Sequence, residues 1–285
     1  MKIIDAILGE KPCLSFEVFP PKTWDKLDNV METALEIAKL KPDFMSVTYG
    51  AGGTTARYTA EIGEAILKSG VTPLSHLTCV SADKESIHKE LENLKAKGIE
   101  NILALRGDIP EGVDPQTLAY RYSNELVEEI AAFGGFCIGG ACYPESHPES
   151  PNGDFDIAML KRKVDAGCQF LTTQMFFDNN ILYNFMYRLY RKGIQVPVVA
   201  GIMPVTNAKQ IQRICAISKN ALPQRFVRIV DRFGDNPAAL KQAGIAYATE
   251  QIIDLYANGI NAVHVYSMNK PDVAMAIRDN LTEIV

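Results

Sequence analysis

The chain has 285 residues, of which 47% are hydrophobic and 22% are charged, and its formal net charge is −5. This composition is typical of a globular protein and excludes a disordered, collagenous or small disulfide-stapled chain. The acidic balance argues against nucleic acid or an anionic membrane as the principal partner. The first residues carry no long apolar stretch, and no run of about 18 uncharged apolar residues occurs elsewhere, so we expect a cytoplasmic protein without a membrane span.

Several common patterns of catalytic chemistry do not occur in the sequence. The six cysteines form no C-x-x-C pair, and most lie within apolar runs, so we expect reduced thiols. Histidines and cysteines do not cluster at metal-ligand spacing, and there is no G-x-S-x-G elbow. The sequence therefore predicts neither a metal site nor a serine nucleophile.

Short apolar runs rich in β-branched residues alternate with longer amphipathic stretches along the whole chain. The runs predict eight strands, at Cys13–Phe19, Phe44–Gly50, Leu74–Val80, Asn101–Gly107, Cys137–Tyr143, Phe170–Phe177, Val196–Met203 and Ala262–Met268. Between them the apolar spacing becomes helical, and several of these stretches end in a glycine that an apolar residue follows. The repeating unit is therefore a helix, a glycine and a strand.

Eight such units predict an α/β protein, a single closed (β/α)8 barrel over residues 1–285. Continuously apolar strands such as Ile102–Leu105 fit a parallel sheet that helices cover. The unit after the seventh strand is longer, with a predicted loop around Arg225 to Asn236 and a helix from Pro237 to about Asn258. The alternative is an open doubly wound sheet, but the G-x-G-x-x-G fingerprint of its dinucleotide-binding form is absent.

In a barrel of this kind the active site lies at the carboxyl ends of the strands. Polar residues stand at seven of the eight predicted strand ends: Glu17, Thr48, His76, Arg106, Asp108, Tyr143, Gln174, Tyr266 and Lys270 are among them. The histidines differ in how well they are placed for chemistry. We expect His264, in the middle of a strand, to be a satisfied core residue, whereas His76 and His147 are better placed for chemistry.

Glu17 lies in the first predicted strand, between Phe16 and Val18. Burial among such neighbours disfavours the charged carboxylate, so it should raise the pKa and keep the proton on the carboxyl at higher pH. A general acid needs that property. The other interpretation, which Glu17 by itself favours, is a carboxylate paired with a nearby Arg or Lys.

Two further strand ends could recognise a ligand. Arg106 could hold an anionic cofactor group and Asp108 a heterocycle, or the two could form an ion pair that stabilises the loop. Gln174 precedes the apolar segment Met175–Phe177, which suits a flat nitrogen heterocycle with mixed hydrogen-bonding edges. Alternatively, Gln174 satisfies buried backbone groups while the aromatic side chains pack the barrel.

With these residues in view, the chain resembles the methylenetetrahydrofolate reductase family of flavoproteins. The resemblance is collinear over nearly the whole chain. The matching stretches are Ser15–Pro21, Val47–Gly53, His76–Cys79, Ala104–Asp108, Tyr143–Pro148, Leu160–Gly167, Thr173–Asp178, Gly201–Val205 and His264–Asn269.

The resemblance implies a TIM barrel that binds FAD at the carboxyl ends of its strands without a Rossmann fold. It implies reduction of 5,10-methylenetetrahydrofolate to 5-methyltetrahydrofolate by NAD(P)H in a ping-pong scheme, as part of one-carbon metabolism and methionine biosynthesis. The small-molecule substrates would be NAD(P)H and methylenetetrahydrofolate, and the protein would be a homo-oligomer.

The resemblance also assigns roles by position. Glu17 would be the general acid, and Asp108 would be catalytic near both flavin and pterin. Gln174, Tyr266 and Lys270 would bind substrate. The residues that would bind FAD are Thr48, His76, Leu105, Arg106, Gly107, Asp108, Tyr122, Ala141, Tyr143, Asp156 and Lys163.

The chain departs from the family pattern at three places. Lys270 stands where the family usually has Arg, which replaces a planar two-pronged contact with a point charge. Ile214 stands where many members have a bulky aromatic residue, and the chain ends at Val285 without the regulatory domain of eukaryotic members, so feedback by adenosylmethionine is not expected. Two alternatives stay open: a pterin-dependent methyltransferase that passes a methyl group to a corrinoid, and a flavin-binding subunit of a larger redox complex.

Overall fold

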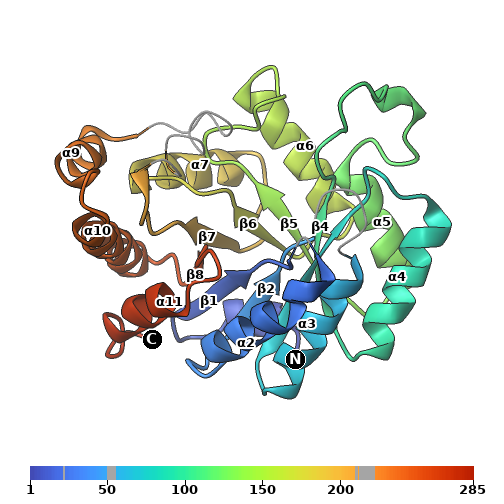
Figure 1. Cartoon of the computed structure of the whole chain (residues 1–285). Coiled ribbons are helices and arrows are strands. Elements are labelled where there is room, and N and C mark those ends of the chain that lie inside the picture. The colour runs from blue at the N-terminus through green and yellow to red at the C-terminus, as the bar shows by residue number, and fades with distance from the viewer. Residues whose placement is uncertain (22, 50–55, 209–210, 212–221) are drawn as a thin grey trace.

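The computed structural model describes residues 1–21, 23–49, 56–208, 211 and 222–285, and it contains a closed barrel of parallel strands (Figure 1). The strands follow one another in chain order around the barrel, and β1 pairs with β8 to close it. They are β1 (Cys13–Val18), β2 (Phe44–Val47), β3 (Thr72–Thr78), β4 (Asn101–Leu105), β5 (Cys137–Cys142), β6 (Phe170–Thr173), β7 (Val198–Ile202) and β8 (Ala262–Val265). The predicted (β/α)8 barrel is confirmed.

Each strand ends before its predicted last residue. Phe176 and Phe177, for example, continue the apolar run of β6 but lie outside its ladder, in the segment that leads to the next helix. Hydrophobicity alone could not reveal this boundary, because both side chains are fully buried although they no longer pair with a neighbouring strand. Most of the polar residues at the predicted strand ends therefore lie in the loops that follow the strands, whereas Glu17 and His76 stay within β1 and β3.

Helices form the outer layer of the molecule (Figure 1). They are α1 (Ile3–Ile7), α2 (Leu27–Ala38), α3 (Ala56–Lys68), α4 (Lys84–Ala96), α5 (Ser123–Phe133), α6 (Gly153–Asp165), α7 (Asn179–Arg191), α9 (Gln224–Phe233), α10 (Pro237–Ala257) and α11 (Pro271–Asp279), with short 3₁₀ turns at Trp24–Lys26 and Pro115–Thr117. None of the helices in this described part of the chain is both long and apolar enough to cross a bilayer.

The predicted loop around Arg225 to Asn236 is wrong, because most of this segment forms α9. Phe226 is buried, and its ring stacks on Phe177 with the ring centroids 5.0 Å apart and meets Tyr247 edge-on at 4.9 Å. Apolar residues at positions 226, 230 and 233 recur at helical spacing, which the charged residues between them obscure. The helix packs against α10, which begins at Pro237 as predicted.

One end of the barrel is closed by apolar side chains. Ile3 and Ile7 of α1 are buried in a cluster with Phe44, Phe170 and other residues from the amino-terminal parts of the strands. The Asn101 side chain fixes α1 there by accepting a hydrogen bond from the Ile3 backbone N at 2.8 Å. The opposite end, where the strands have their carboxyl ends, is the end that can receive ligands.

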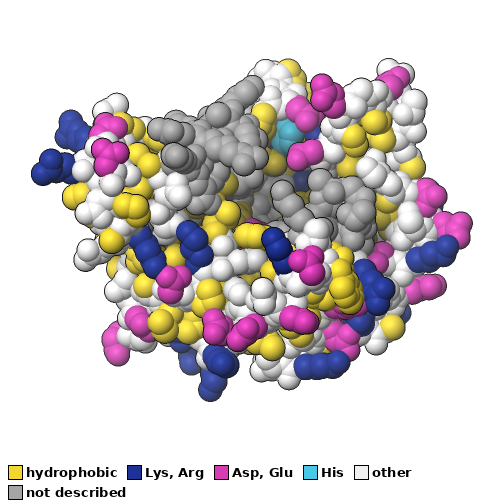
Figure 2. All heavy atoms as spheres, viewed as in Figure 1, with side chains coloured by type: hydrophobic (Ala, Val, Ile, Leu, Met, Phe, Trp, Pro, Cys, Tyr) yellow, Lys and Arg dark blue, Asp and Glu magenta, His cyan; other side chains and the backbone are white. Residues whose placement is uncertain are grey.

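The face of the molecule drawn in Figure 2 mixes charges of both signs. Among the described residues, Lys and Arg side chains and Asp and Glu side chains are both distributed over this face. Two expectations fall outside the described residues: the part of the second resembling stretch that begins at Gly50, and the departure at Ile214.

Candidate functional site

Two neighbouring cavities lie at the carboxyl ends of the strands. The outer cavity has a volume of about 530 Å³ and the inner cavity a volume of about 410 Å³. Ala141 and Tyr143 line both, so the cavities adjoin at the end of β5. The outer cavity is lined mainly by residues that follow β4 and β5, including Arg106, Tyr122, Glu149, Asp156 and Lys163. The inner cavity lies within the barrel and is lined by residues including Glu17, His76, Leu105, Thr172, Gln174 and Tyr266.

Glu17 projects from β1 into the inner cavity, and its side chain is only 16% exposed. Burial raises the pKa of this carboxyl to about 8, from an ordinary value of 4.5. Among the described residues, only two histidines come within ion-pair distance: Oε2 lies 3.9 Å from His76 Nε2 and 4.0 Å from His264 Nε2. Glu17 is therefore an uncharged acid at neutral pH rather than the partner of an Arg or Lys.

Both of these histidines are neutral. Burial lowers the pKa of His76 and of His264 to about 3, and for His264 the proximity of His76 adds to the effect. His264 Nδ1 lies 2.8 Å from Ser15 Oγ, and its Nε2 lies 2.9 Å from Ser46 Oγ. Because Ser15 donates its own proton to the Val263 carbonyl at 3.0 Å, His264 carries its proton on Nδ1 and accepts at Nε2. His264 is the satisfied core residue that its position predicts.

Gln174 and Tyr266 bring hydrogen-bonding groups to the inner cavity. Gln174 follows β6, and its Oε1 accepts a hydrogen bond from the Met175 backbone N at 2.9 Å. Its NH2 group has no partner among the described residues, so it can donate to a ligand. Tyr266 donates its hydroxyl proton to the Thr173 carbonyl at 2.6 Å, and burial raises its pKa well above the usual value, so it stays a phenol.

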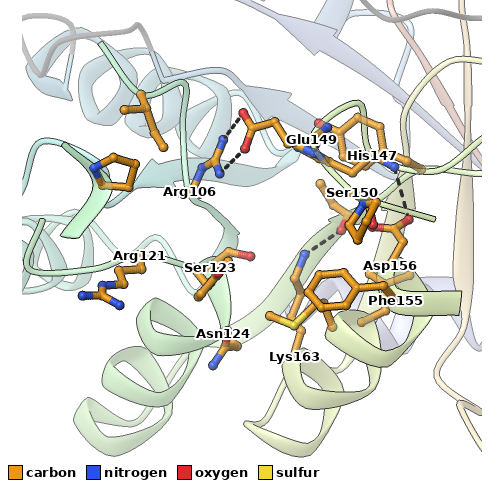
Figure 3. Close-up of a pocket in the computed structure, with 18 of the residues that line it drawn as sticks. Arg106, Arg121, Ser123, Asn124, His147, Glu149, Ser150, Phe155, Asp156 and Lys163 are labelled. Carbon is orange, nitrogen blue, oxygen red and sulfur yellow. Dashed lines mark hydrogen bonds and ion pairs between the residues drawn. The ribbon is translucent and has the colours of Figure 1, made fainter. Parts of the chain in front are cut away.

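Three cationic side chains line the outer cavity, those of Arg106, Arg121 and Lys163 (Figure 3). Arg106 forms a two-pronged ion pair with Glu149, at 2.7 and 2.8 Å, instead of the predicted alternative pair with Asp108. Lys163 reaches the cavity from α6 and donates to the Ala141 carbonyl at 2.7 Å, and burial lowers its pKa. Arg106 and Lys163, which line the same cavity, suit a ligand with two anionic groups, such as a diphosphate.

Gly107 lets the chain turn sharply after β4. Its φ is +86°, a conformation that other residues rarely adopt. A Cβ at this position would lie 2.9 Å from Val80 Cγ1, so a side chain would also collide with the loop that follows β3. The turn therefore needs glycine, and it places Arg106 on the cavity side while the chain changes direction before Asp108.

Besides Gly107, three predicted site residues do not line either cavity. Asp108 is exposed, Thr48 is half-buried beside the second strand, and Lys270 donates a hydrogen bond to Thr206 Oγ1 at 2.6 Å. Their roles stay predictions. The remaining predicted residues, Glu17, His76, Leu105, Arg106, Tyr122, Ala141, Tyr143, Asp156, Lys163, Gln174 and Tyr266, line one cavity or both, whereas Gly107 shapes the turn between them.

Thr172 and Glu149 are among the cavity residues that were not predicted from the sequence. Thr172 lies two residues before Gln174, on the same inward face of β6, and its position follows from the two-residue period of a strand. Glu149 lies in the loop after β5, where no periodic signal marks it. Among the described residues no group of three or more His, Cys, Asp and Glu side chains is arranged to hold a metal ion.

The chain is similar to known proteins over almost its whole length. The family model described as methylenetetrahydrofolate reductase matches residues 2–282. The chain is 37% identical over 295 residues to methylenetetrahydrofolate reductase (NADH) 1 of Zea mays, covering 98% of this chain and 50% of the maize protein. It is 33% identical over 265 residues to 5,10-methylenetetrahydrofolate reductase of Escherichia coli (strain K12), covering 93% of this chain and 88% of that protein.

The chain thus spans about half the length of the plant relatives and most of the bacterial ones. Among solved structures, an uncharacterised protein from Clostridium thermocellum that binds two copies of 5-methyl-5,6,7,8-tetrahydrofolic acid superposes with a TM-score of 0.65 at 12% identity, over 99% of this chain and 98% of that one. That likeness concerns the fold alone. The sequence matches go further: the chain belongs to the methylenetetrahydrofolate reductase family.

Proposed function

We propose that residues 1–285 form one catalytic domain that reduces 5,10-methylenetetrahydrofolate to 5-methyltetrahydrofolate with NAD(P)H, using bound FAD in a ping-pong mechanism. Membership of the family supports this proposal. The single observation that carries its chemistry is the buried, uncharged Glu17 in a cavity that it shares with Gln174 and Tyr266. This site combines a proton donor with groups that can recognise a heterocycle.

Glu17 supplies the proton that the reaction needs. Protonation of N10 of the folate breaks the bond between N10 and the methylene carbon and leaves an electrophilic iminium at N5. That carbon then accepts a hydride equivalent derived from NAD(P)H, and Glu17 recovers a proton from solvent. An acid with a pKa of about 8 holds its proton at neutral pH and is still acidic enough to release it in the transition state.

The residues present fit FAD. Arg106 and Lys163 would neutralise its diphosphate at the outer cavity, with Tyr122 and Asp156 on the same wall. Because Ala141 and Tyr143 line both cavities, an elongated cofactor could extend from the outer cavity into the inner one. When bound, a flavin can take two electrons from a reduced nicotinamide and pass them to a second substrate at the same site.

The folate would occupy the inner side of the site. The NH2 group of Gln174 can donate to an acceptor on the pterin edge, and aromatic or aliphatic side chains such as Tyr266 and Met203 cover its faces. Lys270 would attract the carboxylate end of the substrate as a point charge, and Asp108 would approach the bound pair from the loop after β4. These assignments rest on the family resemblance and on the lining of the cavity.

Glu149 should weaken binding of FAD, because its carboxylate competes with phosphate for Arg106. We expect Glu149→Gln to bind FAD about 2- to 5-fold more tightly, a modest gain because Glu149 is 58% exposed and its charge is screened by solvent. Titrating the apoprotein with FAD by fluorescence measures this, with the exposed Glu111→Gln as the matched control. Weaker binding by Glu149→Gln than by Glu111→Gln would show that the carboxylate supports FAD instead.

The experiment that tests the proposed function is a visible absorption spectrum of the purified protein under anaerobic conditions. We expect a flavin spectrum that bleaches with NADH or NADPH and returns when methylenetetrahydrofolate is added. A colourless protein that cannot be reconstituted with FAD would overturn the proposal and favour the methyltransferase alternative. Bound flavin that responds to neither nicotinamide would favour a subunit of a larger redox complex.

A further inference from the structure

We propose that the inner cavity holds one ordered water molecule on three ligands, the carboxyl of Glu17, Nε2 of His76 and the hydroxyl of Thr172. Through this water, Thr172 becomes a positioning residue for the acid. The positioning role of Thr172 rests on the proposed function, because it concerns the carboxylate that Glu17 becomes after it has given up its proton. The water site concerns the protein alone.

Two buried polar atoms of residues that line the inner cavity need a hydrogen-bond partner. Thr172 is 5% exposed and His76 is 7% exposed, and neither Thr172 Oγ1 nor His76 Nε2 has a hydrogen-bond partner among the described residues. Both residues line the inner cavity. A buried polar atom without a partner destabilises the folded state by roughly the strength of the missing hydrogen bond, so such atoms in folded proteins are usually satisfied by an internal water.

The position of Glu17 completes the site. Its Oε2 lies 3.9 Å from His76 Nε2, which is too long for a direct hydrogen bond and short enough for both atoms to share one water molecule. A buried water usually makes about three hydrogen bonds. It would accept the proton of the Thr172 hydroxyl and donate to Glu17 and to Nε2 of His76, which burial keeps neutral.

Two other groups near Glu17 already have hydrogen-bond partners. His264 on β8 uses both ring nitrogens on serine hydroxyls, one of them that of Ser46 on β2. Tyr266, the residue after β8, donates its hydroxyl proton to the Thr173 carbonyl. Tyr143, after β5, lies on the wall between the cavities. Because the ring nitrogens of His264 and the hydroxyl of Tyr266 have partners, the ligands of the proposed water are Glu17, His76 and Thr172.

The strand register accounts for the inward position of Thr172. Phe170, two residues earlier on β6, belongs to the apolar cluster that closes the barrel, and Gln174, two residues later, lines the inner cavity. Thr172 thus stands above the apolar floor and below Gln174. The cavity of about 410 Å³ has ample room, because one water molecule takes about 30 Å³ in the liquid.

The water affects the acid by stabilising its ionised form. When Glu17 loses its proton, the water can donate a hydrogen bond to the new carboxylate, and the Thr172 hydroxyl fixes the water in the orientation for doing so. Thr172→Val keeps the shape of the side chain and removes this donor. We expect the pKa of Glu17 to rise by a further 0.5 to 1 unit or so, since one hydrogen bond to the carboxylate is lost.

The test compares the wild type, Thr172→Val and Thr173→Val as purified, without added NADH or folate. Thr173 is the matched control, because it lies on the same strand but its hydroxyl accepts a hydrogen bond from the Gly201 backbone N at 2.8 Å. Crystal structures locate the water, and infrared titration of the Glu17 carboxyl measures its pKa. We expect the water in the wild type and in Thr173→Val, its loss in Thr172→Val, and a raised pKa in Thr172→Val alone.

No ordered water between Glu17, His76 and Thr172 in the wild type would overturn the site, whether or not either variant folds. An unchanged pKa of Glu17 in Thr172→Val would overturn the positioning role. In the proposed reaction, the loss of folate-dependent flavin reoxidation at high pH should begin at a higher pH in Thr172→Val, by the same shift. A colourless protein with the water in place would refute the proposed function and leave the water site standing.

Discussion

Replacing Glu17 with glutamine should leave reduction of the flavin by NADH within about twofold of the wild-type rate and slow its reoxidation by methylenetetrahydrofolate by roughly 10²- to 10⁴-fold. Glutamine has the size of the uncharged carboxyl but carries no acidic proton, so only the half-reaction that opens the folate ring loses its donor. Because Glu17 is already neutral at neutral pH, the substitution should not disturb folding.

Anaerobic stopped-flow measurements of the two half-reactions test this separation directly. Glu111→Gln, an exposed position on the loop after β4, is the matched control and should match the wild type in both half-reactions. Equal losses in both half-reactions of Glu17→Gln would contradict the acid role, because they would point to a general distortion of the site.

The second large effect is expected at Gly244, in the middle of α10. A Cβ at this position would lie 1.8 Å from the Val205 carbonyl oxygen and 2.7 Å from its carbonyl carbon. Both are backbone atoms of the segment after β7. The close contact therefore cannot be relieved without shifting α10 or the loop that follows Met203. We expect Gly244→Ala to lower the free energy of unfolding by about 3 kcal/mol.

The sign of this effect distinguishes it from ordinary helix propensity. Alanine in an unhindered helix interior is more stabilising than glycine by about 1 kcal/mol, so without the contact Gly244→Ala would stabilise the protein. Ala246→Gly, at an exposed position of the same helix, calibrates the propensity and should destabilise by about that amount. Denaturant unfolding of the three proteins measures both, and a Gly244→Ala protein as stable as the wild type would refute the close contact.

The sequence predicted the barrel because its signals are local and repeated. Each strand is an apolar run, and several helices are followed by a glycine with positive φ, such as Gly98, a few residues before the next strand. The helix α9 escaped prediction because its inward positions, including Phe226, are few and are separated by arginines. Its stability comes from stacking on Phe177, a contact between segments that are distant in the sequence.

A site residue could be predicted from the sequence where its chemical type is unusual for its position in the chain. Glu17 stands out because a carboxylate in an apolar strand needs an explanation, and its raised pKa follows from the burial that the strand imposes. The pairing of Arg106 with Glu149 could not be predicted, because it depends on the course of the loop after β5. The position of Asp108 outside both cavities could not be predicted either, because it depends on the left-handed turn at Gly107.

The account depends most on the claim that Glu17 is an uncharged acid at neutral pH. Infrared difference spectra between the wild type and Glu17→Gln isolate this one carboxyl, and a titration from about pH 5 to about pH 10 follows its proton. We predict a carboxylic acid band at neutral pH that converts to a carboxylate band near pH 8. A carboxylate band already present at neutral pH, with a midpoint near the ordinary value of 4.5, would contradict the account.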